Sequence, residues 1–319
     1  MCLIERPVQI GAFAAALLCL VSTASAQIAR GLRPGDILVN QDYLVPGGAA
    51  EHGTFLIDPV TLQKTPFYQS YEAPNSLAVD RDGTVLSADG FFREIVRLDS
   101  QGRVLRRYKD VRATGDMAIA PDGGIYLSRF QRIYRLDPAS GVVAQVANIP
   151  QAEGQVNGLA SGPDGSLYVT RTGGLPTSPR GVFRVDLTNG TLTPVSTGGL
   201  LTGPFSLTFD GTGSLIVSDL SSSLVRVDPA TGAQQLLSSG GLLERPGPLA
   251  LEPRGTLLVI GSAPGGAGSG LLRVDPATGA QTFLTGLTSP IDLAVVPFPE
   301  PWGGAILIAS GVALLRRRR

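Results

Sequence analysis

Polar side chains that suit metal binding recur just before a series of short apolar runs along the chain. The positions at or just before these runs are Asn75, Ser76, Asp116, Asn157, Ser206 and Asp292. If the runs meet in the fold, their carboxylate, amide and hydroxyl oxygens converge, and several oxygen ligands at one point suit a hard cation such as Ca²⁺ or Mg²⁺. The candidate metal ligands are therefore Asn157, Asp292, Asp116 and Asn75. The alternative, which we favour, is a solvated channel whose polar walls are hydrogen-bonded.

A second group of polar residues lies at the ends of other apolar runs and in longer segments between them. We interpret residues 41–53, 171–180 and 261–269 as long loops, and such loops on a rigid scaffold are a common place for binding. The residues that we expect on a ligand-binding face are Asp42, Glu51, His52, Arg171, Asp89 and Asp219.

The side-chain combinations that usually serve nucleophilic catalysis are scarce in this sequence. His52 is the only histidine in the chain and lies in a Gly-rich segment, where we expect it to face solvent rather than complete a Ser-His-Asp triad. Both cysteines, Cys2 and Cys19, fall in an N-terminal segment that we expect to be removed, which excludes thiol chemistry and disulfides from the remaining chain. The catalytic residues stay unknown, and the composition favours binding over catalysis.

The elements that position these residues are repeats. The sequence RVDPATGAQ occurs at 226–234 and again at 273–281, and looser copies recur elsewhere. Each unit contains four short runs rich in Val, Ile, Leu and Tyr, bounded by Gly, Pro or Asp, which is typical of strands. In Asp-Pro-Ala-Thr-Gly, the proline pre-sets φ, the aspartate bonds forward to the backbone and the glycine accepts positive φ. The carboxylates of such turns are therefore expected to be structural.

Six such units can be counted, and their offset predicts a closed ring. The first unit lacks its opening strand, while residues 291–296 supply an extra strand after the last unit. A ring closed by that strand leaves no sheet edge open. We therefore predict an all-β, six-bladed β-propeller of four-stranded blades, with the first blade closed by the C-terminal strand.

A family resemblance supports this fold. The stretch 157–160 (NGLA) followed by 163–169 (PDGSLYV) is similar to NHL-type repeats and to gluconolactonase/regucalcin-like and streptogramin-lyase-like propellers. In gluconolactonase-like hydrolases, a Glu, an Asn before an inner strand and an Asp hold a divalent ion. The resemblance implies that Asn157 matches that Asn and that Asp292 or Asp116 supplies a carboxylate. The Glu-Gly-Pro that opens the first blade in that family is replaced here by Arg33-Pro34-Gly35.

The two ends of the chain resemble targeting segments. Residues 1–26 have an apolar stretch followed by Ala24-Ser25-Ala26, which is typical of a secretory signal peptide. Residues 299–319 contain Pro299-Glu300-Pro301, an apolar run expected to form a short helix, and Arg316, Arg317, Arg318 and Arg319. That order resembles the PEP-CTERM sorting signal. The resemblance implies a transient inner-membrane anchor, processing by an exosortase-type protease, and sorting to the surface of a Gram-negative bacterium. An ordinary C-terminal anchor is the alternative.

The charge balance of the chain limits the classes of partner that we expect it to bind. The 319 residues include 26 basic and 26 acidic side chains. The sequence has no stripe of basic residues, which argues against nucleic-acid binding. We predict that residues 27–298 form an exported propeller that binds a glycan or a surface protein as a component of the cell envelope or extracellular matrix. The alternatives are a divalent-metal-dependent hydrolase or lyase of the gluconolactonase type and a purely structural surface-layer protein.

Overall fold

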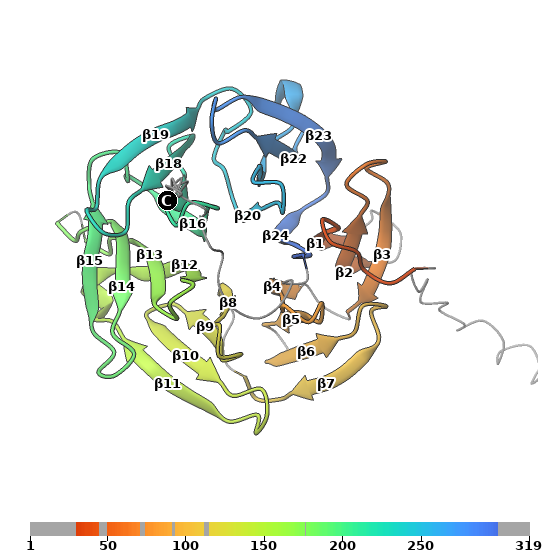
Figure 1. Cartoon of the computed structure of the whole chain (residues 1–319), viewed down its shortest axis with the longest axis horizontal. Coiled ribbons are helices and arrows are strands. Elements are labelled where there is room, and N and C mark those ends of the chain that lie inside the picture. Colours follow the sequence, from red (N-terminus) through yellow and green to blue (C-terminus); the bar gives the residue numbers. More distant parts are fainter. Residues whose placement is uncertain are drawn as a thin grey trace, which may run out of the picture.

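Six four-stranded antiparallel sheets form a ring around a central axis in the computed structural model of the chain (Figure 1). The structure describes residues 30–44, 50–70, 74–90, 93–111, 115–175 and 177–298. Each sheet runs from an inner strand near the axis to an outer strand at the rim (Figure 1). The chain is a six-bladed β-propeller, so the predicted all-β fold and blade number are confirmed.

The strands follow the sequence repeat, four to a blade. Blade 1 contains β24 (Pro290–Val295), β1 (Ile37–Leu44), β2 (Ala50–Ile57) and β3 (Lys64–Gln69). Blade 2 contains β4 (Pro74–Val79), β5 (Val85–Asp89), β6 (Glu94–Leu98) and β7 (Val104–Tyr108). Blade 3 contains β8 (Met117–Ile119), β9 (Ile125–Arg129), β10 (Arg132–Leu136) and β11 (Val143–Asn148).

The second half of the ring has the same order. Blade 4 contains β12 (Gln155–Ser161), β13 (Leu167–Thr172), β14 (Gly181–Val185) and β15 (Leu192–Thr197). Blade 5 contains β16 (Pro204–Phe209), β17 (Leu215–Asp219), β18 (Ser223–Val227) and β19 (Gln234–Ser239). Blade 6 contains β20 (Leu249–Leu251), β21 (Leu257–Ser262), β22 (Ser269–Val274) and β23 (Gln281–Leu287). Two short 3₁₀ turns, η1 (Gln151–Glu153) and η2 (Pro264–Gly266), lie between strands.

The repeated turns form as their sequence predicts. Asp228 Oδ1 accepts the backbone N–H of Ala230 at 2.8 Å, and Gly232 has φ 72°. A Cβ at Gly232 would also lie 2.3 Å from the Val195 carbonyl oxygen, so only glycine fits this turn against the neighbouring blade. The carboxylates of these turns therefore serve the backbone.

Blade 1 combines strands from both ends of the described chain. Strand β24 pairs antiparallel with β1, with Leu293 opposite Val39 and Val295 opposite Ile37. The hydrogen bonds of this pairing tie the last blade strand to the first one in sequence. The ring is therefore closed by the same kind of backbone hydrogen bonds that join the strands within each blade.

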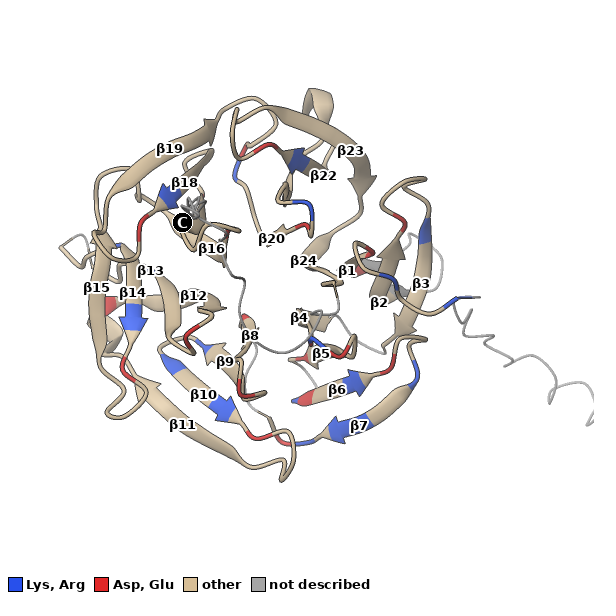
Figure 2. Cartoon of the chain, in the orientation of Figure 1, with Lys and Arg blue, Asp and Glu red and all other residues tan. Residues whose placement is uncertain are grey.

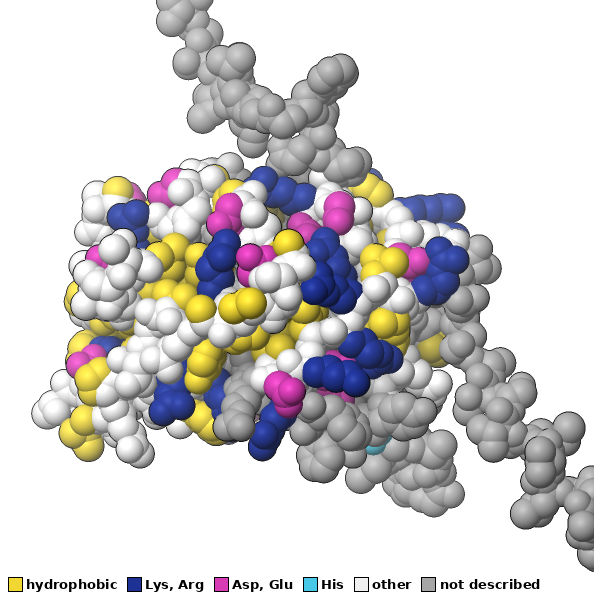
Figure 3. All heavy atoms as spheres, turned by 90° about the horizontal axis from the view of Figure 1, so that it is seen from below, with side chains coloured by type: hydrophobic (Ala, Val, Ile, Leu, Met, Phe, Trp, Pro, Cys, Tyr) yellow, Lys and Arg dark blue, Asp and Glu magenta, His cyan; other side chains and the backbone are white. Residues whose placement is uncertain are grey.

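Apolar side chains fill the spaces between neighbouring blades. In one of six such clusters, Leu86 of blade 2 packs with Leu127 of blade 3, and both are fully buried. Closer to the rim, arginines of the third strands pair with acids of the preceding hairpin, as in Arg97–Asp80 at 2.8 Å and Arg273–Glu252 at 2.6 Å (Figure 2). The rim beside blades 2 and 3 accordingly shows basic side chains next to acidic ones (Figure 3).

The prediction of a long loop at residues 41–53 was wrong. Strands β1 and β2 continue through most of it, and their register extends to Leu44 opposite Ala50. Gly53, which suggested a loop, instead has φ 149° beside β3, where a Cβ would lie 2.3 Å from the Tyr68 carbonyl oxygen. Its lack of a side chain permits close strand packing.

The two predicted targeting segments lie outside the described residues, including the expected C-terminal helix. Within the described part of the chain, we find no helix with the length and apolar character that a membrane span requires.

Candidate functional site

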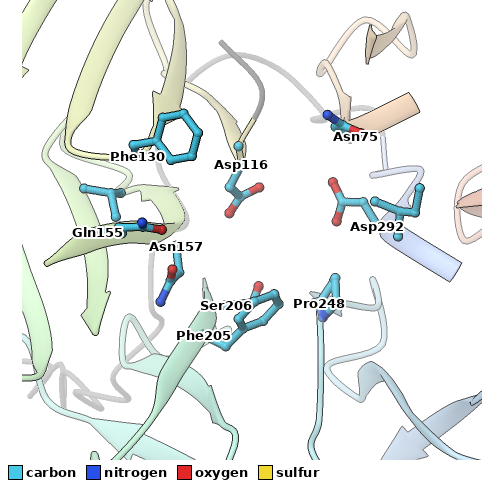
Figure 4. A pocket seen from close by; sticks show the side chains of 12 residues that line it. Asn75, Asp116, Phe130, Gln155, Asn157, Phe205, Ser206, Pro248 and Asp292 are labelled. Atoms are coloured by element: carbon cyan, nitrogen blue, oxygen red, sulfur yellow. The ribbon is translucent and has the colours of Figure 1, made fainter. Parts of the chain in front are cut away.

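A cavity of about 300 Å³ opens at the centre of the ring, at the starts of the inner strands. It is lined by 12 residues from all six blades (Figure 4). They are Asn75, Gly115, Asp116, Phe130, Gln155, Val156, Asn157, Phe205, Ser206, Pro248, Ile291 and Asp292. The four candidate metal ligands of the sequence analysis are therefore brought together, along with Ser206.

Two carboxylates dominate this cavity. The side chains of Asp116 and Asp292 point toward each other across it (Figure 4). Asp116 lies directly before β8, and Asp292 is in β24, so they belong to blades 3 and 1. Asp292 is only 9% exposed, whereas Asp116 is partly exposed through the cavity.

The backbone holds both carboxylates in the same way. Asp116 accepts N–H groups from Met117 and Leu159, both at 2.8 Å. Asp292 accepts them from Leu293 at 2.8 Å and from Leu77 at 2.7 Å. One bond of each pair is local and the other reaches the inner strand of the next blade. Each aspartate therefore joins two blades as it faces the cavity.

The repeat does not require an acid at this position. Strand registers make Asp116 and Asp292 equivalent, and the other four blades carry a different residue type there. The residues at the equivalent position are Ser76, Gly158, Ser206 and Pro248. Serine, glycine and proline are all compatible with the fold at this point, so the repeat by itself does not require the two carboxylates.

The surroundings favour the protonated form of both acids. Burial raises the pKa of Asp116 to about 6, and its hydrogen bonds from Leu159 and Met117 offset only part of that rise. Burial also raises the pKa of Asp292 well above its usual value, and the nearby charge of Asp116 raises it further. The N–H groups of Leu77 and Leu293 act in the opposite direction. Both carboxyls therefore hold their protons to a higher pH than an exposed aspartate does.

Two amides and two aromatic rings complete the cavity. Asn157 Nδ2 donates to the Pro204 carbonyl oxygen at 3.1 Å and to Thr172 Oγ1 at 3.3 Å, and Asn157 lines the cavity (Figure 4). Asn75 lies beside Asp292 in the same view (Figure 4). The rings belong to Phe130 and Phe205.

The sequence analysis missed Phe130. It stands in the two-residue turn between β9 and β10, is 56% exposed and has φ 52°. A positive φ is unfavourable for a side chain with a Cβ, and a large exposed apolar ring is also unusual. An aromatic residue in a turn where glycine is the usual choice was the available signal.

The six residues predicted on a ligand-binding face all lie in strands, near the ends of β1, β2, β5, β13 and β17. His52 pairs with Asp42 across β1 and β2, with His52 Nδ1 2.6 Å from Asp42 Oδ1, and its side chain is 12% exposed rather than solvent-facing. Glu51 is also in β2. These residues are in strands because β1 and β2 extend beyond the predicted loop boundary, and neither Asp42 nor His52 lines the axial cavity.

The other three are buried at strand ends. Arg171, in β13, is 2% exposed, forms an ion pair with Glu153 at 2.5 Å and lies 4.1 Å from the centre of the Phe183 ring. Asp219 is fully buried and accepts the N–H of Gly203 at 2.9 Å. Asp89 ends β5 and is 9% exposed. Arg171 and Asp219 make polar contacts within the protein, at the strand ends where the sequence predicted them.

The predicted processing residues lie outside the described part of the chain. They are Ala24, Ala26, Pro299, Glu300, Pro301, Arg316, Arg317, Arg318 and Arg319.

The cavity meets part of the requirement for a divalent ion. Carboxylate and amide oxygens are the donors that Ca²⁺ and Mg²⁺ prefer. However, the described residues gather no set of three or more His, Cys, Asp or Glu side chains. Both oxygens of each aspartate also accept a backbone N–H already. The donor chemistry therefore suits a hard cation, whereas the number of charges is low.

Comparisons with known proteins support the fold alone. No protein-family model and no curated protein matches the sequence. Among solved structures, a streptogramin B lyase matches with TM-score 0.52 and 16% identity, over 78% of this chain and 73% of that one. A virginiamycin B lyase from Staphylococcus aureus gives 0.55 and 15%, over 80% and 86%. A chain of a nidogen/laminin complex gives 0.64 and 15%, over 82% and 98%. These are streptogramin-lyase-like and NHL/YWTD-type propellers, as the sequence resemblance predicted.

Proposed function

We propose that this protein is a binding propeller, exported to the cell envelope or extracellular matrix, that takes a small ligand or the end group of a larger one into its axial cavity. The observation that carries the proposal is the pair of carboxylates, Asp116 and Asp292, that face one cavity and are not required by the repeat. A volume of about 300 Å³ lies at the small end of the range for ligand pockets. Polar groups among apolar walls are the usual composition of such pockets.

The export part of the proposal rests on the ends of the sequence. The leader-like residues 1–26 and the Pro299-Glu300-Pro301 motif with its terminal arginines support secretion, transient anchoring and surface sorting by an exosortase-type protease. Mass spectrometry of the protein recovered from its native cells tests this part. We expect a chain that begins at Gln27 and ends near Pro299; an intact N-terminus would contradict export.

Thermal unfolding tests the binding part. A ligand that binds only the folded state adds about 4 kcal/mol at a thousandfold excess over its dissociation constant, which is an easily measured shift. We would add sugars, amines, Ca²⁺, Mg²⁺ and a chelator to the wild type and to Ser206→Phe, whose larger side chain fills the cavity. A compound that raises the unfolding temperature of the wild type alone supports binding in the cavity. Equal shifts in both proteins, or none, would contradict it.

A metal-dependent hydrolase or lyase is the second candidate. The observation that favours it is that Asn75, Asp116, Asn157 and Asp292 all line the same cavity. It predicts one tightly held divalent ion in the purified protein, and loss of both metal and lactone turnover in Asn157→Ala. Unchanged metal content in that variant would reject this candidate.

A further inference from the structure

The acidic side chains of the axial cavity have no basic partner among the described residues that line it. None of the described residues that line it is Lys or Arg, whereas two are aspartates. Elsewhere in the described part of the chain, half-buried and buried acids such as Asp80, Asp210 and Glu252 are paired with arginines. Asp116 and Asp292 form no such pair with a described residue and accept backbone N–H groups. A positively charged ligand would supply the positive charge that the residues lining the cavity lack.

The aromatic rings limit the kind of cation. Phe130 and Phe205 both line the cavity (Figure 4), and Phe130 is largely exposed. A ring face attracts an organic ammonium group and also contacts its carbon atoms. A bare divalent ion gains little from a phenyl ring, because it prefers oxygen ligands. Acids and aromatic rings on one small cavity are complementary to a cation with an apolar body.

A second space, a groove beside β10 and the end of β11, shares Phe130 with the cavity. Phe130 also lines this second space of about 570 Å³, together with Tyr134 and Ile149. The Arg129 guanidinium lies 5.7 Å from the centre of the Phe130 ring and lines that groove rather than the cavity. The positive charge of Arg129 therefore lies outside the axial cavity. The cavity itself is left open for a separate cation.

We propose, building on the binding function above, that the axial cavity recognises a small molecule with a protonated primary amine. The ammonium group lies between Asp116 and Asp292 and donates to their oxygens and to the side-chain oxygen of Asn157. The carbon skeleton contacts Phe130 and extends toward the groove beyond it.

The titration of the acid pair gives this site a pH dependence. Asp116 and Asp292 are the titratable groups among the lining residues. A bound cation stabilises the ionised carboxylates, which lowers their pKa and releases protons. Affinity for an amine that is itself protonated throughout should therefore rise as pH increases from 5 to 8.

Calorimetric titration with benzylamine and benzyl alcohol tests the proposal, because the two probes have similar size and differ in charge. We expect benzylamine to bind the wild type at least tenfold more tightly than the alcohol at pH 7.5, with proton release seen as a buffer-dependent enthalpy. Asp116→Asn and Asp292→Asn should each lower the affinity at least tenfold, and Phe130→Ala several-fold. Asp122→Asn, which removes an exposed turn carboxylate, is the matched control and should bind as the wild type does.

The possible failures are distinguishable. Equal binding of the amine and the alcohol, or binding of glucose in preference to both, overturns the amine proposal and leaves the binding function standing. Binding of Ca²⁺ that needs Asp116 and ignores Phe130→Ala overturns it in favour of the metal site. If no probe binds and none shifts the unfolding temperature, both proposals fail. The wild-type comparison of the two probes needs no variant, so a misfolded substitution does not affect it.

Discussion

Replacing Asp116 with asparagine should change how the stability of the propeller depends on pH. Burial raises the pKa of this carboxyl from 3.8 to about 6 in the folded protein. Because the folded-state pKa is the higher one, the contribution of Asp116 is most favourable below 3.8 and is lost as pH rises through 6. Asparagine does not titrate, so Asp116→Asn should remove this loss.

The magnitude follows from the pKa difference. A shift of about 2 units at roughly 1.4 kcal/mol per unit gives about 3 kcal/mol between the ends of the window. Asp116 keeps contact with the solvent of the cavity, which reduces the effect. We therefore expect the free energy of unfolding of the wild type, relative to the variant, to fall by about 1–3 kcal/mol between pH 4 and pH 8.

Urea denaturation at several pH values measures this difference. The loss of a hydrogen-bond acceptor in Asp116→Asn shifts the free energy of unfolding by the same amount at every pH. The test is therefore the slope, against pH, of the difference between wild type and variant. Asp122→Asn is the control, because the Gly124 N–H and then Arg135 lower the pKa of Asp122, and burial only partly opposes them. The stability that Asp122 contributes is lost as pH falls, so its difference curve should slope the opposite way and only slightly. A flat curve for Asp116→Asn, or one with the slope of the control, would refute the reasoning.

Three further predictions concern the scaffold. Phe130→Gly should be more stable than Phe130→Ala by about 1 kcal/mol in denaturant unfolding, because the φ of 52° strains any residue with a Cβ; an advantage for alanine would contradict this backbone account. Leu127→Ala should lower the free energy of unfolding by about 2–5 kcal/mol, since Leu127 is 1% exposed between blades, while Val142→Ala at a 61% exposed position should change it by less than about 0.5 kcal/mol. A chain that ends at Leu287 lacks β24 and exposes the edge of β1, so it should lose cooperative thermal unfolding, whereas one that ends at Phe298 should keep it; cooperative unfolding of the shorter chain would show that β24 is dispensable.

The repeat made most of the fold predictable from sequence. Asp-Pro-Ala-Thr-Gly specifies its turn locally, because the Asp228 carboxylate and the positive φ of Gly232 act within five residues. Blade number follows by counting such turns. The end of β1 was harder to predict, since Gly53 serves close packing against Tyr68 in the neighbouring strand. That contact depends on strand pairing, which a local pattern does not contain.

The candidate site was predictable only in part. The positions before inner strands identified Asp116, Asn157 and Asp292, because a ring of equivalent strands brings equivalent positions to the axis. Phe130 reaches the same cavity from a hairpin between the second and third strands of its blade. Its place depends on the curvature of one blade relative to the next, which sequence spacing does not give. The burial of Arg171 beside Phe183 depends on the pairing of β13 with β14, which a local pattern does not contain.

The central claim is that the carboxylate pair of the axial cavity is the binding site, and the backbone amides that donate to it can report on this directly. The amide protons of Leu77, Met117, Leu159 and Leu293 are hydrogen-bonded to Asp116 or Asp292. We would record their NMR shifts as a ligand that raises the unfolding temperature is added. The account predicts that these four amides move together and saturably, while the turn amide of Ala277, which donates to Asp275, stays in place. A stabilising ligand that leaves the four amides unmoved and shifts others would contradict it.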